Sequence, residues 1–232
     1  MDGADASTLG RRLPARLSLA DSVYDILLAR LMEGSPAPGE PLNIDALARD
    51  LEVSQTPIRE ALARLESTGL VTRAALKGYR VAPLFTAREI DNLMDARGVI
   101  EPVNAFLASA RITSGVLNDL AESIDELVES PRGPGFSEIR DYWAADERFH
   151  NLIAEQADNE FLLGAYQSLG GHVQRFRLFG GLGVTDADAA IAEHTVILEA
   201  FRVGNAEAAR DAMAAHITSV KSRARHDREA RH

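Results

Sequence analysis

The sequence contains no cysteine among its 232 residues. Disulfides, thiolate zinc sites and a cysteine nucleophile are therefore excluded, and His, Asp and Glu remain as the side chains that could hold a metal. Long apolar runs are absent too: none approaches the roughly 18 residues that a membrane-crossing helix needs, and the N-terminal stretch lacks the apolar middle of a secretion signal. These absences predict a cytoplasmic protein with no membrane partner.

Positive charge is scarce overall, because 25 Lys and Arg stand against 35 Asp and Glu. This argues against a basic surface over the whole molecule, but the regions differ. Residues 1–84 carry 10 basic and 11 acidic side chains, whereas residues 85–232 carry 15 and 24. The length exceeds a typical single domain of roughly 100–200 residues, so two domains are expected, the first of them compatible with a locally basic face.

Three helical patterns follow a tail without periodicity, residues 1–17. The apolar spacing in "LADSVYDILLARLMEGS" predicts a first helix that ends at Gly34, and "NIDALARDLEV" predicts a short second helix capped by Asn43. Ser54 can cap a third helix, which ends at Gly69. Two short helices joined by a tight turn are the pattern of a helix-turn-helix.

A hairpin follows the third helix. "LVTRAALKGYRVAPL" predicts two strands, residues 70–74 and 79–83, around a turn that contains Gly78. Three helices and this wing make residues 18–84 a predicted winged helix-turn-helix domain. The pattern alone also fits a small helical domain that uses the same helices to contact other proteins.

The start of the third helix has the side chains that DNA reading requires. A recognition helix inserts its N-terminal residues into the major groove and needs small or polar residues there, with a cation on the same face. The hydroxyls of Ser54 and Thr56 can contact phosphates, and the amide of Gln55 can contact a base edge. The guanidinium of Arg59 can contact guanine or phosphate. The tip of the wing can approach the DNA backbone or the minor groove. The candidate DNA-binding residues are Ser54, Gln55, Thr56, Arg59, Lys77 and Gly78.

The segment "PGEPLNIDALARDLEVSQTPIREALARLESTGLV", followed by "KGYRV", resembles the winged helix of the GntR family of bacterial transcription regulators. The resemblance covers about residues 19–84 and implies DNA binding. One position departs from it: family members commonly carry Arg directly after the Ser of "SQTPIREAL", where this chain has Gln55. One charge is thereby removed from the reading edge, which favours a different operator sequence with the same docking.

The second part of the chain, residues 85–228, predicts an all-helical domain of about six helices, so the fold class is mostly α. Gly- and Pro-containing segments such as "SPRGPG" and "GGLG" separate the helical patterns. The expected helices are residues 86–111, 114–129, 137–157, 159–179, 187–203 and 205–226. The final "HDREARH" is expected to be a solvated, charged tail.

Four side chains in these helices suggest a metal site. Asp146 and His150 in "DERFH" are four residues apart, so both project from one helix face and supply half of a divalent-metal site. His194 in "IAEHTVIL" and His216 in "AMAAHITSV" lie on mostly apolar helical stretches. If those helices pack together, one carboxylate and three imidazoles converge inside the bundle; each His taken alone is more often a satisfied buried side chain. His172 is left unassigned.

This arrangement resembles the FCD ligand-binding domain that follows the winged helix in the FadR subfamily of GntR regulators. The resemblance implies that Asp146, His150, His194 and His216 hold a divalent metal, with zinc favoured and nickel, manganese or iron as alternatives. It also implies that Arg97 in "LMDARGVIEP" binds a carboxylate effector through its guanidinium fork. Without the resemblance, Arg97 and Glu101 would be a structural ion pair, and Glu101 is expected to be the structural partner in either case.

Two functions fit these residues. The first is an effector-responsive transcription regulator, not an enzyme: a homodimeric repressor, released from a palindromic DNA operator by a small organic acid. The alternative is a metal-dependent hydrolase or dioxygenase that uses the Asp and His site. No nucleophile motif such as G-x-S-x-G or H-E-x-x-H accompanies the site, and the winged helix favours the regulator.

Overall fold

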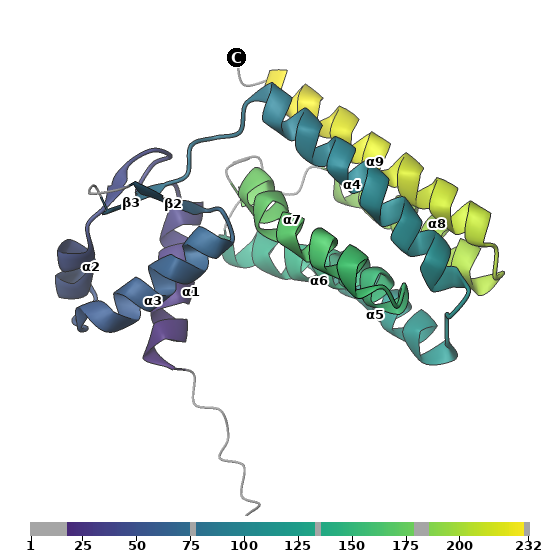
Figure 1. Cartoon of the computed structure of the whole chain (residues 1–232), viewed down its shortest axis with the longest axis horizontal. Helices are drawn as coiled ribbons and strands as arrows, with labels where there is room; N and C mark the ends of the chain where they lie inside the picture. Colours follow the sequence, from purple (N-terminus) through teal and green to yellow (C-terminus); the bar gives the residue numbers. More distant parts are fainter. Residues whose placement is uncertain (1–17, 75–77, 133–135, 179–185, 230–232) are drawn as a thin grey trace, which may run out of the picture.

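The computed structural model describes residues 18–74, 78–132, 136–178 and 186–229. Within them, a small unit of helices and strands precedes a larger group of helices (Figure 1). In order, the elements are α1 (Leu19–Met32), β1 (Pro41–Leu42), α2 (Ile44–Asp50), α3 (Gln55–Ser67), β2 (Val71–Ala74), β3 (Gly78–Val81), α4 (Ala87–Ser109), α5 (Ser114–Glu129), α6 (Phe136–Gln156), α7 (Glu160–Leu178), α8 (Ala187–Arg202) and α9 (Ala206–Glu229). The predicted fold class is confirmed.

The head, defined here as α1 to β3, is built on capped amphipathic helices. Asn43 accepts a hydrogen bond from the backbone N–H of Ala46, which satisfies one of the free donors at the start of α2. Leu27 of α1 and Leu62 of α3 are both buried in the same apolar cluster, which the strands also cover. This shared core fixes α3, the candidate recognition helix, against the rest of the head.

The head contains a three-stranded antiparallel sheet of order β1-β3-β2. Strand β1 was not predicted from the sequence, which indicates only the two strands of the wing. It is only two residues long, too short to show the alternation that predicts a strand, and it forms because Leu42 pairs with Tyr79 of β3. The wing strands β2 and β3 are antiparallel neighbours, with Arg73 opposite Tyr79.

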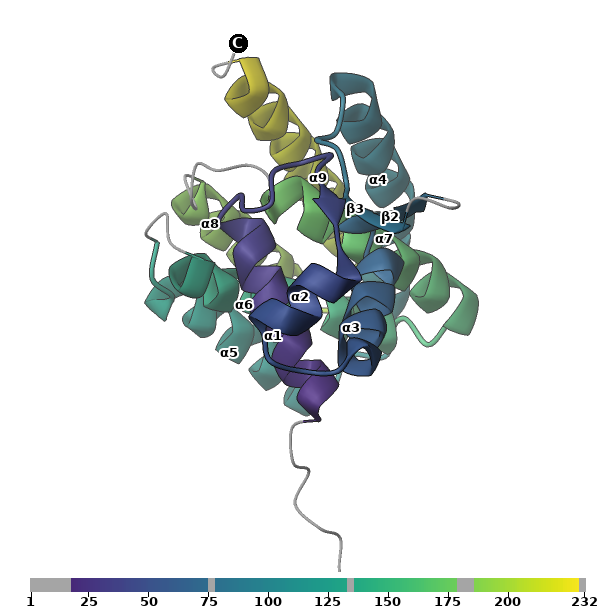
Figure 2. The ribbon, with the colours of Figure 1, turned by 90° about the vertical axis from the view of Figure 1, so that its left-hand side faces the viewer.

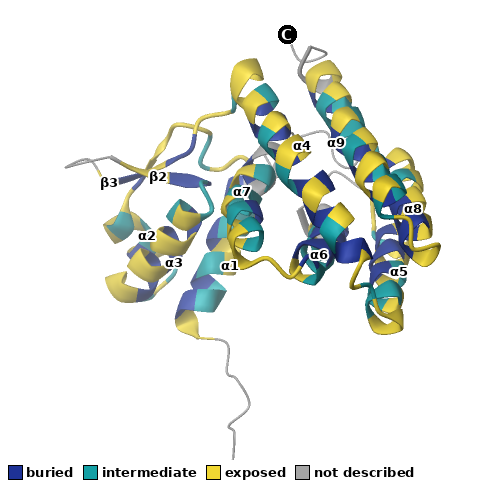
Figure 3. Cartoon of the chain, turned by 45° about the vertical axis from the view of Figure 1, so that its right-hand side comes forward, coloured by how far each residue is buried: buried dark blue, intermediate teal, exposed yellow. Residues whose placement is uncertain are grey.

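The bundle, defined here as α4 to α9, has α4 and α9 side by side in opposite directions (Figure 1). The side chain of Arg225 near the end of α9 donates to Asp91 near the start of α4, at 2.7 Å. A capping box at Thr86 and Glu89 starts α4. Figure 3 shows the buried residues of the bundle helices on their facing sides and the exposed residues outside.

The end of α9 differs from the prediction. The charged tail was expected to begin at His226, but α9 continues to Glu229. No Gly or Pro interrupts "HDRE", so nothing in these residues ends the helix. None of the helices in the described ranges is long and apolar enough to cross a membrane.

The head contacts the bundle through α1, which packs against α6, and through the end of α3; Figure 2 shows the head in front of the bundle. Trp143 of α6 packs against the apolar core of the head and also against a cluster inside the bundle. At the far end of α3, the backbone of Thr68 touches α7 at Gly171. The head is therefore held by two helices, α6 and α7, that also take part in the interior of the bundle.

Candidate functional site

The start of α3 presents the predicted DNA-reading side chains to solvent. Ser54, Gln55, Thr56 and Arg59 are all exposed. Arg59 donates to the side-chain oxygen of Gln55 at 2.9 Å, and the Gln55 amide in turn donates to the carboxylate of Asp45 on α2. Gln55 therefore bridges the two helices of the helix-turn-helix and holds Arg59 along the exposed edge.

The other predicted DNA contacts are less uniform. Ser54 is the N-cap residue of α3, but its side chain makes no capping hydrogen bond, so the hydroxyl remains available at the surface. Gly78 begins β3 with a φ of 77°, a conformation that favours glycine. Lys77, the predicted cation of the wing tip, lies outside the described residues.

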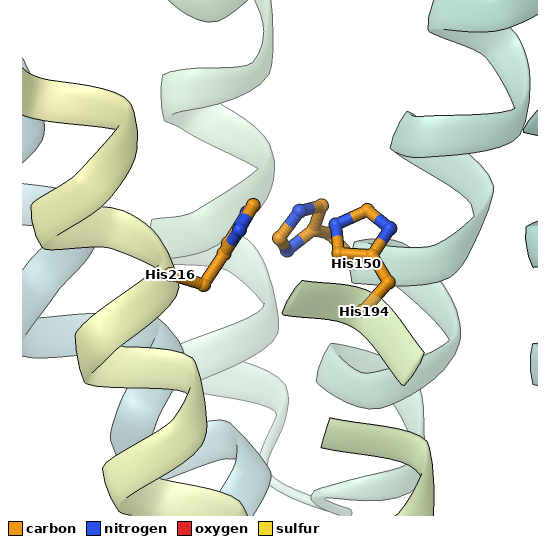
Figure 4. Close-up of side chains that lie close together, drawn as sticks. All are labelled: His150, His194 and His216. Carbon is orange, nitrogen blue, oxygen red and sulfur yellow. The ribbon is translucent and has the colours of Figure 1, made fainter. Parts of the chain in front are cut away.

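Three imidazoles converge inside the bundle from three different helices. His150 of α6, His194 of α8 and His216 of α9 place one ring nitrogen each within 4.8 Å of one another (Figure 4). All three side chains are buried, and His194 is 0 % exposed. The sequence spacing could place only one of them on the face of Asp146, whereas the fold brings all three together.

Asp146 lies beside this cluster and is 3 % exposed. One carboxylate oxygen is 3.7 Å from Nε2 of His194, and the other is 4.0 Å from Nε2 of His150. These separations are longer than hydrogen bonds. They leave the carboxylate facing the imidazoles across a small gap, which is the donor set of three nitrogens and one oxygen that suits several divalent metals.

A carboxylate lies at Nδ1 of two of the three imidazole rings. Nδ1 of His216 is 2.7 Å from Oε2 of Glu193, and Arg223 donates to both oxygens of that carboxylate at 2.8 and 3.0 Å. Nδ1 of His150 lies 2.7 Å from Oε2 of Glu101. A carboxylate at Nδ1 fixes the proton there and turns Nε2 inward as a lone-pair donor. Nε2 of His216 has no hydrogen-bond partner among the described residues.

The electrostatic environment keeps both supporting carboxylates ionised. Burial raises the pKa of Glu101, but the neighbouring guanidinium and imidazole lower it further, so its pKa lies well below the usual range. Burial also raises the pKa of Glu193, while hydrogen bonds from His216 and Arg223 bring it to about 2. The pKa of His216 is lowered because burial disfavours the imidazolium, despite the bond to Glu193. A neutral imidazole supported by an ionised carboxylate is ready to bind a metal.

Aromatic packing fixes the third ring. Phe149 is fully buried and stacks on His194 with ring centroids 4.1 Å apart and planes within 8°. The same ring meets His150 edge-on, with centroids 5.7 Å apart. Phe149 directly precedes His150 in "DERFH". Because its ring fills the space beside His150 and His194, these two side chains cannot adopt other rotamers.

Arg97 lines a narrow cavity next to the cluster. The cavity has a volume of about 30 Å³, and its lining residues are Arg97, Trp143, Asp146, Glu147, His150, Tyr166, Gly170 and Val173. Arg97 donates to Glu101 at 2.5 Å and is only 2 % exposed, so the pair is buried and is not the surface ion pair that an i, i+4 spacing suggests. Burial raises the pKa of Tyr166, which keeps its hydroxyl protonated beside this cavity.

Sequence reasoning missed the residues that support the site. Glu193 directly precedes His194, but it acts on His216 of another helix, so no local spacing reveals it. Arg223 lies seven residues after His216 on the same helix face, a signal that is too common to be specific. Tyr166 of α7 lines the cavity. No sequence pattern indicated this role, because it depends on how α7 packs against α6.

Both parts of the chain match known families. Residues 19–81 match the model of bacterial regulatory proteins of the gntR family, and residues 92–219 match the model of the FCD domain. A probable D-xylose utilization operon transcriptional repressor of Paenarthrobacter nicotinovorans is 26% identical over 204 residues, 88% of each chain. The transcriptional repressor RspR of Escherichia coli is 24% identical over 208 residues, 89% of each chain.

A solved structure shares the whole architecture. The structure of E. coli McbR/YncC aligns with a TM-score of 0.70 at 22% sequence identity, over 91% of this chain and 99% of that chain. At this level of identity the likeness concerns the fold: the order of a winged helix and a helical bundle is the same.

Proposed function

Since the chain belongs to the GntR family of bacterial regulatory proteins and carries an FCD domain, we propose that it is a metal-containing repressor that a small organic acid releases from DNA. Two relatives that align over most of their length are described as repressors, which supports repression over activation. Regulation of transcription through DNA also decides against the metal-dependent enzyme that the Asp and His cluster alone left open.

DNA would be read by the exposed start of α3. Gln55 and Arg59 are hydrogen-bonded to each other at this edge, so the amide and the guanidinium would address adjacent base edges as a unit. The bundle carries most of the acidic excess of the chain, and its field would repel DNA everywhere except at the head. A homodimer would place two heads on the two halves of a palindromic operator.

The metal is supported by one observation above all: three buried imidazoles whose ligand atoms lie within 4.8 Å of one another. Nε2 of His216 is buried without a hydrogen-bond partner among the described residues, which costs free energy unless a ligand satisfies it. His150, His194, His216 and Asp146 would hold the ion, with zinc favoured. When bound, the ion would supply positive charge that attracts a carboxylate.

The effector would sit in the cavity next to these ligands. Arg97 and Asp146 both line it, so a carboxylate could meet the guanidinium and the ion at once, and this favours a small organic acid. Glu101 keeps the guanidinium in place through hydrogen bonds at 2.5 and 3.3 Å. Arg97 would thus be a prearranged donor that needs no reorientation when an acid arrives.

Selection of binding sites from random duplex DNA tests the regulator directly. The purified protein should recover a palindrome and bind it at least about a thousandfold more tightly than scrambled DNA at the same salt concentration. Weak binding that depends on salt but not on sequence, before and after zinc loading, would contradict the proposal.

Metal analysis tests the site itself. The His194→Ala variant should lose bound zinc, because one of four converging donors is removed. The matched control is His226→Ala, since His226 is exposed near the end of α9 and lies outside the cluster. Equal zinc content in the two variants would show that the cluster is not the metal site.

A further inference from the structure

Helix α7 touches the end of the recognition helix through a glycine. A Cβ atom on Gly171 would lie 2.3 Å from the carbonyl oxygen of Thr68 and 2.4 Å from its Cα. Thr68 is the C-cap residue of α3. Because both obstructing atoms belong to the backbone, a side-chain rotation cannot make room, and only glycine allows the two segments to approach so closely.

The same turn of α7 contacts the segment that leaves the head. Arg175 donates to the carbonyl oxygen of Pro83 at 3.1 Å, and its guanidinium lies 3.9 Å from the ring centre of Phe85. Next to the Thr68 contact, a Cβ atom on Gly69 would lie 3.2 Å from Nδ1 of His172. His172, which the sequence left unassigned, therefore belongs to this contact. Two consecutive turns of α7 hold both the end of α3 and the connection to α4.

The opposite side of these turns forms a wall of the cavity beside the cluster. Tyr166, Gly170 and Val173 of α7 line it, and their spacing of four and three residues puts them on one helix face. The cavity of about 30 Å³ has room for only a few water molecules. Even a small organic acid is larger, so its entry requires a wall to move.

We propose that α7 couples the cavity to the recognition helix, with Gly171 as the contact that transmits the displacement. The inference rests on the proposed function and adds the route by which the effector acts on DNA binding. A ligand that pushes Gly170 and Val173 outward also displaces Gly171. Because Gly171 already touches the backbone of Thr68, this displacement moves Thr68 as well. Helix α3 is about 20 Å long from its 13 residues, so a small tilt at Thr68 moves the reading residues at its other end.

The test replaces the unidentified effector by a side chain that occupies the cavity. In Gly170→Leu, the new side chain projects toward Glu147, whose oxygen lies 3.7 Å from the Cβ position. This variant should change affinity for the selected operator by about 5- to 150-fold, the usual range of coupling between sites. The matched control is Gly164→Leu on the same helix, where a Cβ meets nothing within 4 Å; its operator affinity should stay within about twofold of wild type.

A second background alters the close approach itself. Gly171→Ala requires the segments to separate by roughly 1 Å to reach ordinary van der Waals distance, and in this background Gly170→Leu should change operator affinity less than about twofold. Because Gly171→Ala could disturb folding, Arg175→Met provides an independent background, in which the hydrogen bond to Pro83 is lost and the same loss of coupling is expected.

The outcomes separate this inference from the proposed function. If the wild-type protein selects no operator, the proposed function fails. If the wild type selects an operator and Gly170→Leu binds it like Gly164→Leu, the coupling through α7 is wrong. It is also wrong if Gly170→Leu has the same effect with and without the Gly171 and Arg175 substitutions, since the signal would then pass elsewhere, for example through Trp143.

Discussion

Replacing Arg97 by Met should destabilise the protein by about 3–5 kcal/mol, because it leaves a buried charge without its main partner. Arg97 and Glu101 are each 2 % exposed, and the guanidinium donates to the carboxylate at 2.5 and 3.3 Å. Met conserves most of the aliphatic volume, so the loss is chiefly electrostatic. After the substitution, the remaining partner of Glu101 among the described residues is His150, whose Nδ1 lies 2.7 Å away.

The double variant Arg97→Met/Glu101→Gln isolates the charge. Gln offers the nearby Nδ1 of His150 an uncharged oxygen and has no charge to desolvate, so we expect this variant to recover at least about 1.5 kcal/mol of the loss. Urea unfolding followed by circular dichroism and by the fluorescence of Trp143, the only tryptophan of the chain, measures the difference. If the single and double variants are equally unstable, the pair is not held by the electrostatics described above.

The pH dependence gives this prediction a sign. In the wild type, the pKa of Glu101 lies below its value in the unfolded chain. The ionised carboxylate therefore contributes fully to stability at neutral pH, and this contribution is lost as the pH falls below the unfolded pKa and through the folded one. Burial is the largest influence on the pKa of Glu101 and raises it, so without the guanidinium of Arg97 we expect this pKa to lie above the unfolded value. Protonation of Glu101 then stabilises the folded variant as the pH falls below neutral. The gap between variant and wild type should narrow over this range; a widening gap would refute the reasoning.

Three further substitutions test other parts of the molecule. Arg59→Ala should weaken specific operator binding by about 1–3 kcal/mol if the guanidinium reads a base, and unchanged affinity in a gel-shift titration would exclude that role. Glu193→Gln should lower zinc affinity about 10- to 100-fold in a chelator competition, because His216 loses the charge behind its Nδ1; wild-type affinity would show that the carboxylate does not support the ligand. Phe149→Leu should lower the free energy of unfolding by about 1–3 kcal/mol through lost packing against His194, and urea denaturation that shows no change would mean that the ring is not tightly packed.

Most of the fold could be predicted from the sequence because its signals are local. Apolar spacing and caps such as Asn43 locate helices wherever a few neighbouring residues decide the conformation. β1 was missed because Pro41 and Leu42 form a strand only through their pairing with β3. The end of α9 was missed for a different reason: charge along "HDRE" was interpreted as a tail, although Arg and Glu are good helix formers.

The candidate site was only partly visible for a physical reason. Asp146 and His150 share one helix face, so their spacing alone indicates a joint role, whereas Glu193 supports His216 across two helices and has no local signature. Gly171 is the extreme case. In a sequence, glycine inside a helix merely lowers helix propensity, and its purpose appears only when the backbone of Thr68 is found against it.

The distribution of ligands among the helices separates a fixed frame from a movable wall. The four candidate ligands come from α6, α8 and α9, so a bound ion would tie these three helices to one another. Helix α7 contributes Tyr166, Gly170 and Val173 to the cavity but none of the four ligands. An acid between the ion and α7 would therefore push against the element that the ion does not restrain. Since that element also contacts the end of α3, metal binding would set the geometry of the cavity, while the acid would set the position of the head.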